Sequence, residues 1–148
     1  MRLSVNRNFH NKDTDNKQYY SVGFETVEVD ADGLMDFILN GWGFSAAYSG
    51  GQRVKDNFIA AQFVALDFDA GTEKSDMDVM LKSRPFISLH ASFLYTTPSH
   101  TPQAPRCRVV FELDQPITSL EDYELLLHSI LELFPDADQA CKDGSRLF

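Results

Sequence analysis

The alternation of apolar and polar residues predicts three strands in the second half of the chain. The strongest signal is "FIAAQFVALDFD" (58–69), an apolar run that ends in two acids. "PFISLHASFLYTT" (85–97) and "RCRVVFELD" (106–114) predict two more strands, and the final "SRLF" (145–148) would begin a fourth. Alternate residues of the third strand would form two faces, one of Val109, Phe111 and Leu113 and the other of Arg108, Val110, Glu112 and Asp114.

Two segments between these strands follow the period of a helix. "TEKSDMDVMLKS" (72–83) predicts a short helix that ends before Pro85. "SLEDYELLLHSILELF" (119–134) predicts a longer helix, with Ser119 as its N-cap. The proline-rich "PSHTPQAP" (98–105) predicts a loop between the second and third strands.

The chain before residue 58 predicts a further small α/β portion. "YYSVGFETVEVD" (19–30) has the alternation of a strand, and "DADGLMDFILNG" (30–41) predicts a helix that ends at Gly41. "WGFSAAYSGG" (42–51) predicts a short strand and a glycine turn. The whole order therefore predicts an α+β fold, in which an antiparallel sheet of the RRM-like (split βαβ) type carries an additional N-terminal α/β portion.

Composition limits the class of protein. With 148 residues and 43% hydrophobic residues, the chain is long and apolar enough for one domain with a core. No apolar run is long enough for a membrane span and no signal peptide is evident, so we expect no membrane partner and a cytoplasmic location. Cys107 and Cys141 lack metal-ligand spacing, and we expect both to be reduced and structural. The net charge of −9 argues against a broad basic surface for nucleic acid.

The two acids at the end of the apolar strand are the first candidates for chemistry. Asp67 and Asp69 are two residues apart, so both would project to one face of a strand. With Asp114 or Asp138 nearby, they could bind divalent cations such as Mg²⁺ or Mn²⁺, and a pair of such ions would form a phosphoryl-transfer centre. The alternative is that the strand ends here and the acids belong to a solvated loop or a helix N-cap.

A second group of polar residues surrounds the predicted loop. Hydroxyls, an imidazole and two guanidiniums would suit a polyphosphate. These residues are Thr97, Ser99, His100, Arg106 and Arg108. The alternative is a solvent-exposed histidine, with the arginines in surface ion pairs with Glu112 or Asp114.

The polar tail of the chain is either a solvated loop or a further part of the site. It would supply a third carboxylate, from Asp138, and another arginine, Arg146. In a split βαβ sheet we expect Asp114 and this tail beside Asp67. We expect the loop with His100 at the far end of the sheet, unless the hairpin is twisted or the acids lie in the middle of their strand.

The order of these motifs resembles the catalytic core of archaeo-eukaryotic primases, especially the primase-polymerases of phages, plasmids and mobile elements. "FVALDFD" (63–69) is similar to their apolar strand that ends in Asp-x-Asp. "PSH" (98–100) is similar to their small-residue-x-His motif, with proline in place of the usual small residue. "ADQACKDGSRLF" (137–148) is similar to the "D…KD-SR-F" form of phage and mobile-element members, and "GGQRVKDNFIAAQ" (50–62) to the segment before the first motif. The resemblance covers roughly residues 41–148.

This resemblance implies a DNA primase or polymerase, which transfers nucleotides from nucleoside triphosphates under the direction of a template. Asp67, Asp69 and Asp138 would bind two Mg²⁺ or Mn²⁺ ions, with Asp114 as the competing third carboxylate. The residues that would contact the incoming nucleotide are Ser99, His100, Arg106, Arg108 and Arg146.

The resemblance also implies partners. Single-stranded DNA would be the template, and residues 1–148 would form a single catalytic domain. Related chains continue beyond the last motif, so we expect a fragment or a minimal core that works with a helicase or a C-terminal accessory domain.

Two other functions fit the same residues. A non-catalytic RRM-like module would bind nucleic acid or a protein partner without metal, through aromatic residues such as Phe93, Tyr95 and Phe111. A metal-dependent phosphodiesterase would use the same acids.

Overall fold

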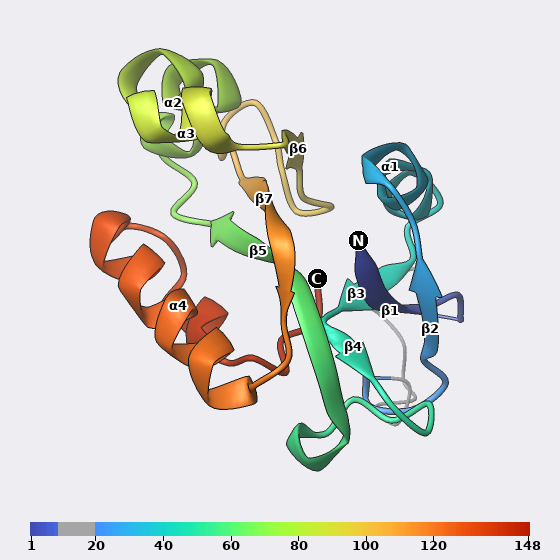
Figure 1. Ribbon diagram of the computed structural model, residues 1–148. Coiled ribbons are helices and arrows are strands. Elements are labelled where there is room, and N and C mark those ends of the chain that lie inside the picture. The colour runs from blue at the N-terminus through green and yellow to red at the C-terminus, as the bar shows by residue number, and fades with distance from the viewer. Residues whose placement is uncertain (9–19) are drawn as a thin grey trace.

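The computed structural model describes residues 1–8 and 20–148 and shows a mixed α+β fold (Figure 1). The described residues form two antiparallel sheets, which we call the N-terminal sheet and the main sheet. The N-terminal sheet has the order β2-β1-β3, from strands β1 (Arg2–Asn6), β2 (Glu25–Glu28) and β3 (Gly43–Ser45). Helix α1 (Ala31–Leu39) lies beside it, capped by Asp30, whose side chain accepts the Gly33 N–H at 2.9 Å.

The main sheet has the order β4-β5-β7-β6, and each strand is antiparallel to its neighbour. Its long central strands, β5 (Phe58–Phe68) and β7 (Cys107–Ile117), lie between the short strands β4 (Ala47–Tyr48) and β6 (Phe93–Thr96). Gly50 and Gly51, both with positive φ, turn the chain from β4 toward β5.

Three helices follow the strands of the main sheet. Helix α2 (Met77–Ser83) and helix α3 (Pro85–His90) connect β5 to β6, and α4 (Leu120–Leu133) follows β7. Figure 1 shows all three on one side of β5 and β7, with the N-terminal sheet and α1 on the other side. The Ser119 hydroxyl accepts the Asp122 N–H at 3.2 Å and caps α4, as the sequence predicted. Short 3₁₀ segments lie at Lys55–Asn57, Glu73–Ser75 and Gln139–Lys142.

Alternation along β5 divides the hydrophobic core in two. Val64, Leu66 and Phe68 belong to the core under the helices. Phe63 and Ala65 belong to a second core, which faces the N-terminal sheet. All five are fully buried, so Asp67, the next residue on the second face, also lies in a buried position.

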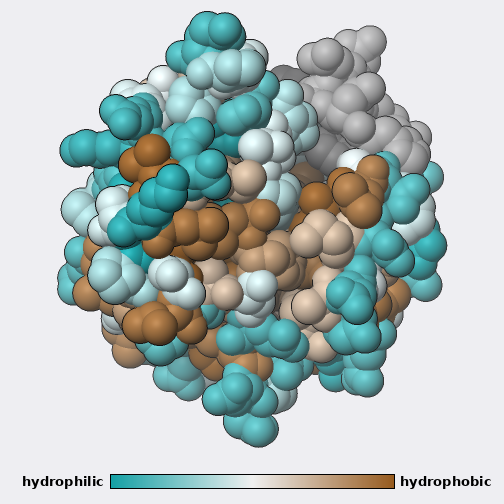
Figure 2. Space-filling view, turned by 90° about the horizontal axis from the view of Figure 1, so that it is seen from above, coloured by the Kyte–Doolittle hydropathy of each residue, from teal (hydrophilic) through white to brown (hydrophobic). Residues whose placement is uncertain are grey.

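The last residue connects the two sheets. Phe148 and Phe44 of β3 exchange two backbone hydrogen bonds, each of 2.8 Å, and their rings lie 5.9 Å apart. The Phe148 ring also meets that of Phe63 at 6.3 Å. Seen from above, hydrophobic residues gather across the middle of the surface, between the side of α2 and α3 and the side of α1 (Figure 2).

Most of the predicted elements are confirmed, and three predictions are wrong. Residues 85–97 form helix α3 and then β6 rather than one strand, because Pro85 begins a helix at its first position. The segment 42–51 forms two strands, β3 and β4, which belong to different sheets. The final "SRLF" (145–148) forms no strand, and only Phe148 pairs with a strand.

One strand was not predicted. β1 is the central strand of the N-terminal sheet, although the sequence analysis assigned no strand to residues 2–6. No helix among the described residues has the length and apolar character needed to cross a membrane.

Candidate active site

Asp67 lies near the end of β5, on the face of the main sheet that is turned toward the N-terminal sheet. Its pairing partner in β7 is Arg108, and Arg108 also pairs with Tyr95 in β6. Arg108 donates from Nε and Nη2 to the two oxygens of Asp67, at 2.5 and 3.1 Å. Its Nη1 donates to the Tyr95 hydroxyl at 2.8 Å. Three neighbouring strands thus hold an acid, a guanidinium and a phenol in one row, which we call the first row.

The tail of the chain brings a second acid and a second arginine to the first row. The backbone N–H of Asp138 donates to the Asp67 carbonyl oxygen at 2.8 Å. Arg146 donates from Nη2 to Asp67 Oδ2 at 2.9 Å and to Asp138 Oδ2 at 2.6 Å. We call Asp67, Asp138, Arg108 and Arg146 the acid–arginine cluster. In it one guanidinium lies between two carboxylates.

Cys141 adds a third potential metal ligand. One ligand atom each from Asp67, Asp138 and Cys141 lies within 4.8 Å of the others, a spacing that could hold a metal ion. The Cys141 sulfur accepts the backbone N–H of Asp67 at 3.4 Å. Burial raises the pKa of Cys141 to about 11, so it is a neutral thiol at pH 7. The two carboxylates are therefore the ligands that carry charge.

The arginines keep Asp67 ionised although it is only 3% exposed. Burial alone would raise the pKa of Asp67, but the charges and hydrogen bonds of Arg108 and Arg146 outweigh it and hold that pKa below its ordinary value. Burial also raises the pKa of Tyr95, to about 12, so its hydroxyl stays neutral and accepts from Arg108.

A second row lies beside the first, toward the loop between β6 and β7. The Thr97 N–H donates to the Arg106 carbonyl at 3.2 Å. The register of β5 and β7, continued by one residue beyond Phe68 and Cys107, brings Asp69 beside Arg106. The Arg106 N–H donates to His100 Nδ1 at 3.1 Å. A neutral His100 therefore carries its proton on Nε2 and can donate from that atom. We call Asp69, Arg106 and Thr97 the second row.

Four buried polar atoms at this site have no hydrogen-bond partner. Within residues 1–8 and 20–148, these are the buried side-chain atoms that lack one: Asp69 Oδ1, Thr97 Oγ1, Arg106 Nε and Arg146 Nε. Buried polar groups are nearly always paired, so unpaired ones need an explanation such as a bound ion or ligand. Because the four belong to the second row and the acid–arginine cluster, they mark one place where a polar ligand would satisfy acceptors and donors together.

The structure corrects the predicted geometry of the His100 loop. β7 is antiparallel to β5, so the start of β7, and not its end, lies beside Asp67. The loop that carries Ser99 and His100 ends at this start and therefore lies at the same end of the sheet as Asp67, not at the far end.

The same pairing separates Asp114 from Asp67. Asp114 is exposed and lies six residues beyond Arg108 on β7, about 20 Å along a strand. Asp138, and not Asp114, therefore accompanies Asp67. Arg108 pairs with Asp67, so the alternative of a surface pair with Glu112 or Asp114 is wrong for this arginine.

Two members of the site were not predicted from the sequence. Tyr95 was considered only as a stacking aromatic, and Cys141 only as a structural thiol. The "ADQAC" segment contained a usable signal, because Asp138 and Cys141 are three residues apart and a helical turn brings such residues together. Phe111, the third candidate aromatic, is buried under the helices.

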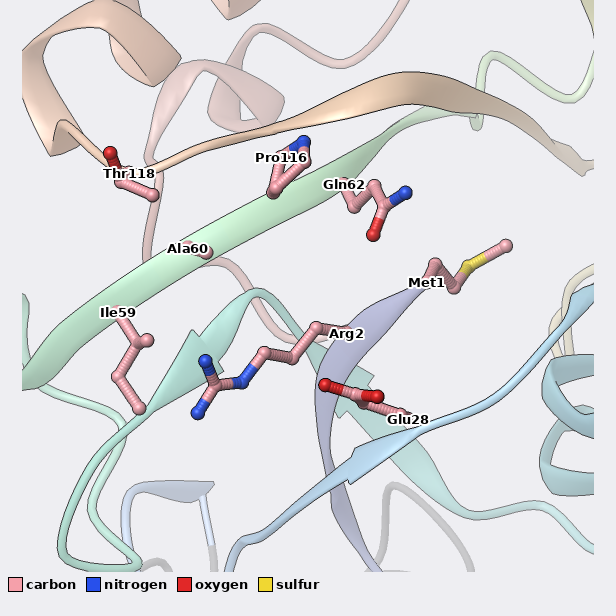
Figure 3. A pocket seen from close by; sticks show the side chains of 8 residues that line it. All are labelled: Met1, Arg2, Glu28, Ile59, Ala60, Gln62, Pro116 and Thr118. Atoms are coloured by element: carbon pink, nitrogen blue, oxygen red, sulfur yellow. The ribbon is translucent and has the colours of Figure 1, made fainter.

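A separate pocket of about 300 Å³ lies between the start of β1, the end of β2 and the main sheet (Figure 3). Arg2 and Glu28 supply its charged side chains and are paired across β1 and β2. None of the predicted site residues lines it. We therefore assign the candidate chemistry to the acid–arginine cluster and the second row.

Comparison with solved structures supports the fold. The chain is similar to "Cyanophage S-2L Primase-Polymerase (PrimPol), AEP domain (PP-N190)", with a TM-score of 0.50 and 13% sequence identity. The match covers 99% of this chain and 70% of that chain. At this identity the likeness concerns the fold. A search of the curated proteins found no match.

The sequence matches the family described as "VapE N-terminal domain" over residues 38–135, more than half of the chain. The matched range contains Asp67, Asp69 and His100 and ends shortly before Asp138. Together with the primase-polymerase fold, this match confirms the resemblance that the sequence motifs indicated. The chain belongs to the VapE N-terminal domain family.

Proposed function

We propose that residues 1–148 form a single catalytic domain of a metal-dependent primase-polymerase, which transfers nucleotides from nucleoside triphosphates under the direction of a single-stranded DNA template. The observation that carries this proposal is the convergence of two carboxylates and two arginines at the end of β5, beside a row of unpaired polar atoms. Nucleotidyl transfer needs such a juxtaposition, because metal ions and guanidiniums together balance the charge of a triphosphate.

The order of the main sheet supports an RRM-like core for this domain. β5 and β6 flank β7 and are both antiparallel to it, and helices α2 and α3 connect them. This order would correspond to the split βαβ arrangement. β4, from the N-terminal part of the chain, occupies the place beside β5 that the fourth strand of such a unit would take.

The donor set fits a hard divalent cation. Asp67 and Asp138 would hold Mg²⁺ or Mn²⁺, whose preferred ligands are carboxylate oxygens, and Asp69, with an unpaired oxygen, would complete the two-metal set. When bound, such ions polarise the phosphoryl oxygens and stabilise the attacking and leaving oxygens. Asp67 is held in position by its backbone contacts to Asp138 and Cys141, which fix the end of β5.

The loop and the second row would bind the triphosphate. His100 would donate from Nε2 to a phosphate oxygen, since its Nδ1 is already occupied by the Arg106 N–H. Arg106 would donate from its unpaired Nε, and Ser99 would contribute from the same loop. Arg108 and Arg146 would balance the charge of the phosphates where they meet the acids.

A primer synthesis and extension assay with Mn²⁺, nucleoside triphosphates and a single-stranded DNA template tests the proposal. Asp138→Asn should lower the rate about 100-fold or more, because charge stabilisation by a bound metal is worth several kcal/mol. Asparagine retains the capping oxygen that accepts the Ala140 N–H, so the fold should persist. Asp114→Asn, a matched exposed control, should leave the rate unchanged.

Equal activity of wild-type protein and Asp138→Asn, or loss of activity in Asp114→Asn instead, would contradict this assignment. Calorimetric titration of Mn²⁺ together with a nucleoside triphosphate separates the enzyme from a non-catalytic nucleic-acid-binding or protein-interaction module. The enzyme should bind the two together, and a module that recognises bases by stacking should bind nucleic acid without metal.

A further inference from the structure

Arg146 occupies the position between the two acids that a cation would share. Its Nη2 donates to Asp67 Oδ2 at 2.9 Å and to Asp138 Oδ2 at 2.6 Å. These carboxylates are two of the three groups whose ligand atoms lie within 4.8 Å of one another. A guanidinium that bridges two carboxylates does for them electrostatically what a shared metal ion would do.

The charges of the acid–arginine cluster already sum to zero. Asp67 and Asp138 carry two negative charges, and Arg108 and Arg146 carry two positive ones. A divalent cation that entered with both arginines in place would give this half-buried cluster an excess of two positive charges, close to a guanidinium of the same sign. Entry of the cation therefore requires either the departure of an arginine or the arrival of an anion.

The two arginines differ in how firmly they are held. Arg108 uses Nε, Nη1 and Nη2 in hydrogen bonds to Asp67 and Tyr95, and its side chain is 12% exposed. Arg146 bonds to the acids through Nη2, leaves its Nε without a partner, and is 21% exposed. It also lies in the loop that follows the 3₁₀ segment Gln139–Lys142, outside the regular helices and strands. Arg146 is therefore the arginine that can leave at the smaller cost.

We infer that Arg146 is an exchangeable counter-cation, which holds the acid pair together until a divalent metal and a triphosphate replace it jointly. This inference rests on the proposed function and adds a role for one residue. The triphosphate supplies the negative charge that the cluster lacks once the metal has entered, and Arg146 turns from the acids to the phosphate oxygens. Metal and nucleotide consequently bind with positive coupling, and Arg146 carries part of that coupling.

Calorimetric titration of Mn²⁺ alone into EDTA-treated and dialysed protein tests the exchange. Arg146→Gln should bind Mn²⁺ on the order of tenfold more tightly than wild type, because the competing cation is gone. Arg84→Gln is the matched control, since Arg84 forms a bidentate pair with Asp136 outside the cluster, and its Mn²⁺ affinity should equal that of wild type. Addition of a non-hydrolysable triphosphate should tighten Mn²⁺ binding strongly in wild type and less in Arg146→Gln.

Thermal unfolding provides a second measurement that does not depend on activity. In EDTA, Arg146→Gln should unfold at a lower temperature than wild type, because two carboxylates then face each other with one counter-charge fewer. Mn²⁺ should raise the unfolding temperature of Arg146→Gln more than that of wild type. Arg146→Lys, which retains the charge, should keep the Mn²⁺ affinity near the wild-type value and serves if the glutamine variant does not fold.

The outcomes separate the inference from the proposed function. If Asp138→Asn abolishes Mn²⁺ binding while Arg146→Gln binds like wild type, the metal site stands and the exchange is overturned. If neither wild type nor Arg146→Gln binds Mn²⁺ with or without triphosphate, the proposed function falls and the inference falls with it. Tighter binding by the Arg84→Gln control would show that net charge, and not the position of Arg146, controls the affinity, and would also overturn the inference.

Discussion

Two aspartate–arginine pairs in this protein are both bidentate and have very different surroundings. Arg108 contacts both oxygens of Asp67, and Arg84 contacts both oxygens of Asp136. Each guanidinium also lies over an aromatic ring, Arg108 over Phe148 at 4.8 Å and Arg84 over Phe68 at 5.0 Å. The bidentate contact by itself therefore does not distinguish a structural pair from a functional site.

The difference lies in burial and in the neighbours of each pair. Asp136 is exposed at its side chain, 37%, whereas Asp67 is buried and receives a second arginine. A second carboxylate and several unpaired polar atoms lie beside Asp67. A purely structural ion pair would leave no polar atom beside it without a hydrogen-bond partner. Buried charges together with unpaired polar atoms therefore indicate a binding site at Asp67.

The largest effect should come from neutralising the buried acid. Asp67→Asn should lower the free energy of unfolding by about 3–5 kcal/mol, because Arg108 then stays buried without its counter-charge. Urea unfolding at pH 7 measures this loss. If Asp67→Asn lost no more unfolding free energy than Asp136→Asn, burial would not explain the difference between the two pairs.

The pH dependence of the same difference should follow the lowered pKa of Asp67. The carboxylate stabilises the folded state at every pH above its ordinary value of 3.8, and this contribution disappears as the pH falls through the lower folded-state pKa. The difference in unfolding free energy between wild type and Asp67→Asn should therefore be constant from pH 7 to pH 5 and should shrink below the ordinary value. If the difference in unfolding free energy between wild type and Asp67→Asn increased as the pH fell, the prediction would be wrong.

An intermediate effect should follow from removing the hydroxyl of the first row. Tyr95→Phe takes away the acceptor of Arg108 Nη1 and leaves a buried donor unpaired, at a cost of about 1–3 kcal/mol. Thermal unfolding should detect the loss. Phe93→Leu, on the same strand but without a hydroxyl, is a control for packing, and a Tyr95→Phe protein as stable as wild type would remove this hydroxyl from the site.

The smallest effect should come from the pair with the exposed carboxylate. Asp136→Asn, which removes the charge opposite Arg84, should change the free energy of unfolding by about 0–1 kcal/mol, because solvent screens this 37% exposed side chain. Primer extension should be unaffected. A double-mutant cycle on Arg84 and Asp136 measures their coupling free energy. If it equalled that of Asp67 with Arg108, the two pairs would contribute equally to stability and the comparison would fail.

The positions of the strands that carry the site could be predicted from the sequence, but the way in which these strands pair could not. The run from Phe58 to Asp69 could be assigned because eleven residues of strand leave a strong apolar signal. Residues 85–90 could not, because "PFISLH" is too short for its period to separate a helix from a strand. The register of β5 against β7 is a long-range pairing, and an error in it moved His100 to the wrong end of the sheet.

The residues of the site were predicted more completely than their interactions. Asp67, His100 and Asp138 stood out by residue type and order. The ion pairs of Asp67 and Asp138 with Arg146 depend on folding of the tail against β5, which no local pattern encodes. The sequence predicted divalent cations as the counter-charges of Asp67, and the structure adds Arg108 and Arg146 as counter-charges from the chain itself.

Phe148 has a practical consequence for protein engineering. Its backbone joins β3, and its ring lies under both Arg108 and Arg146, at 4.8 and 5.9 Å. A deletion of this one residue would remove both backbone hydrogen bonds to β3 and the ring on which both guanidiniums rest. Expression designs should therefore keep Phe148.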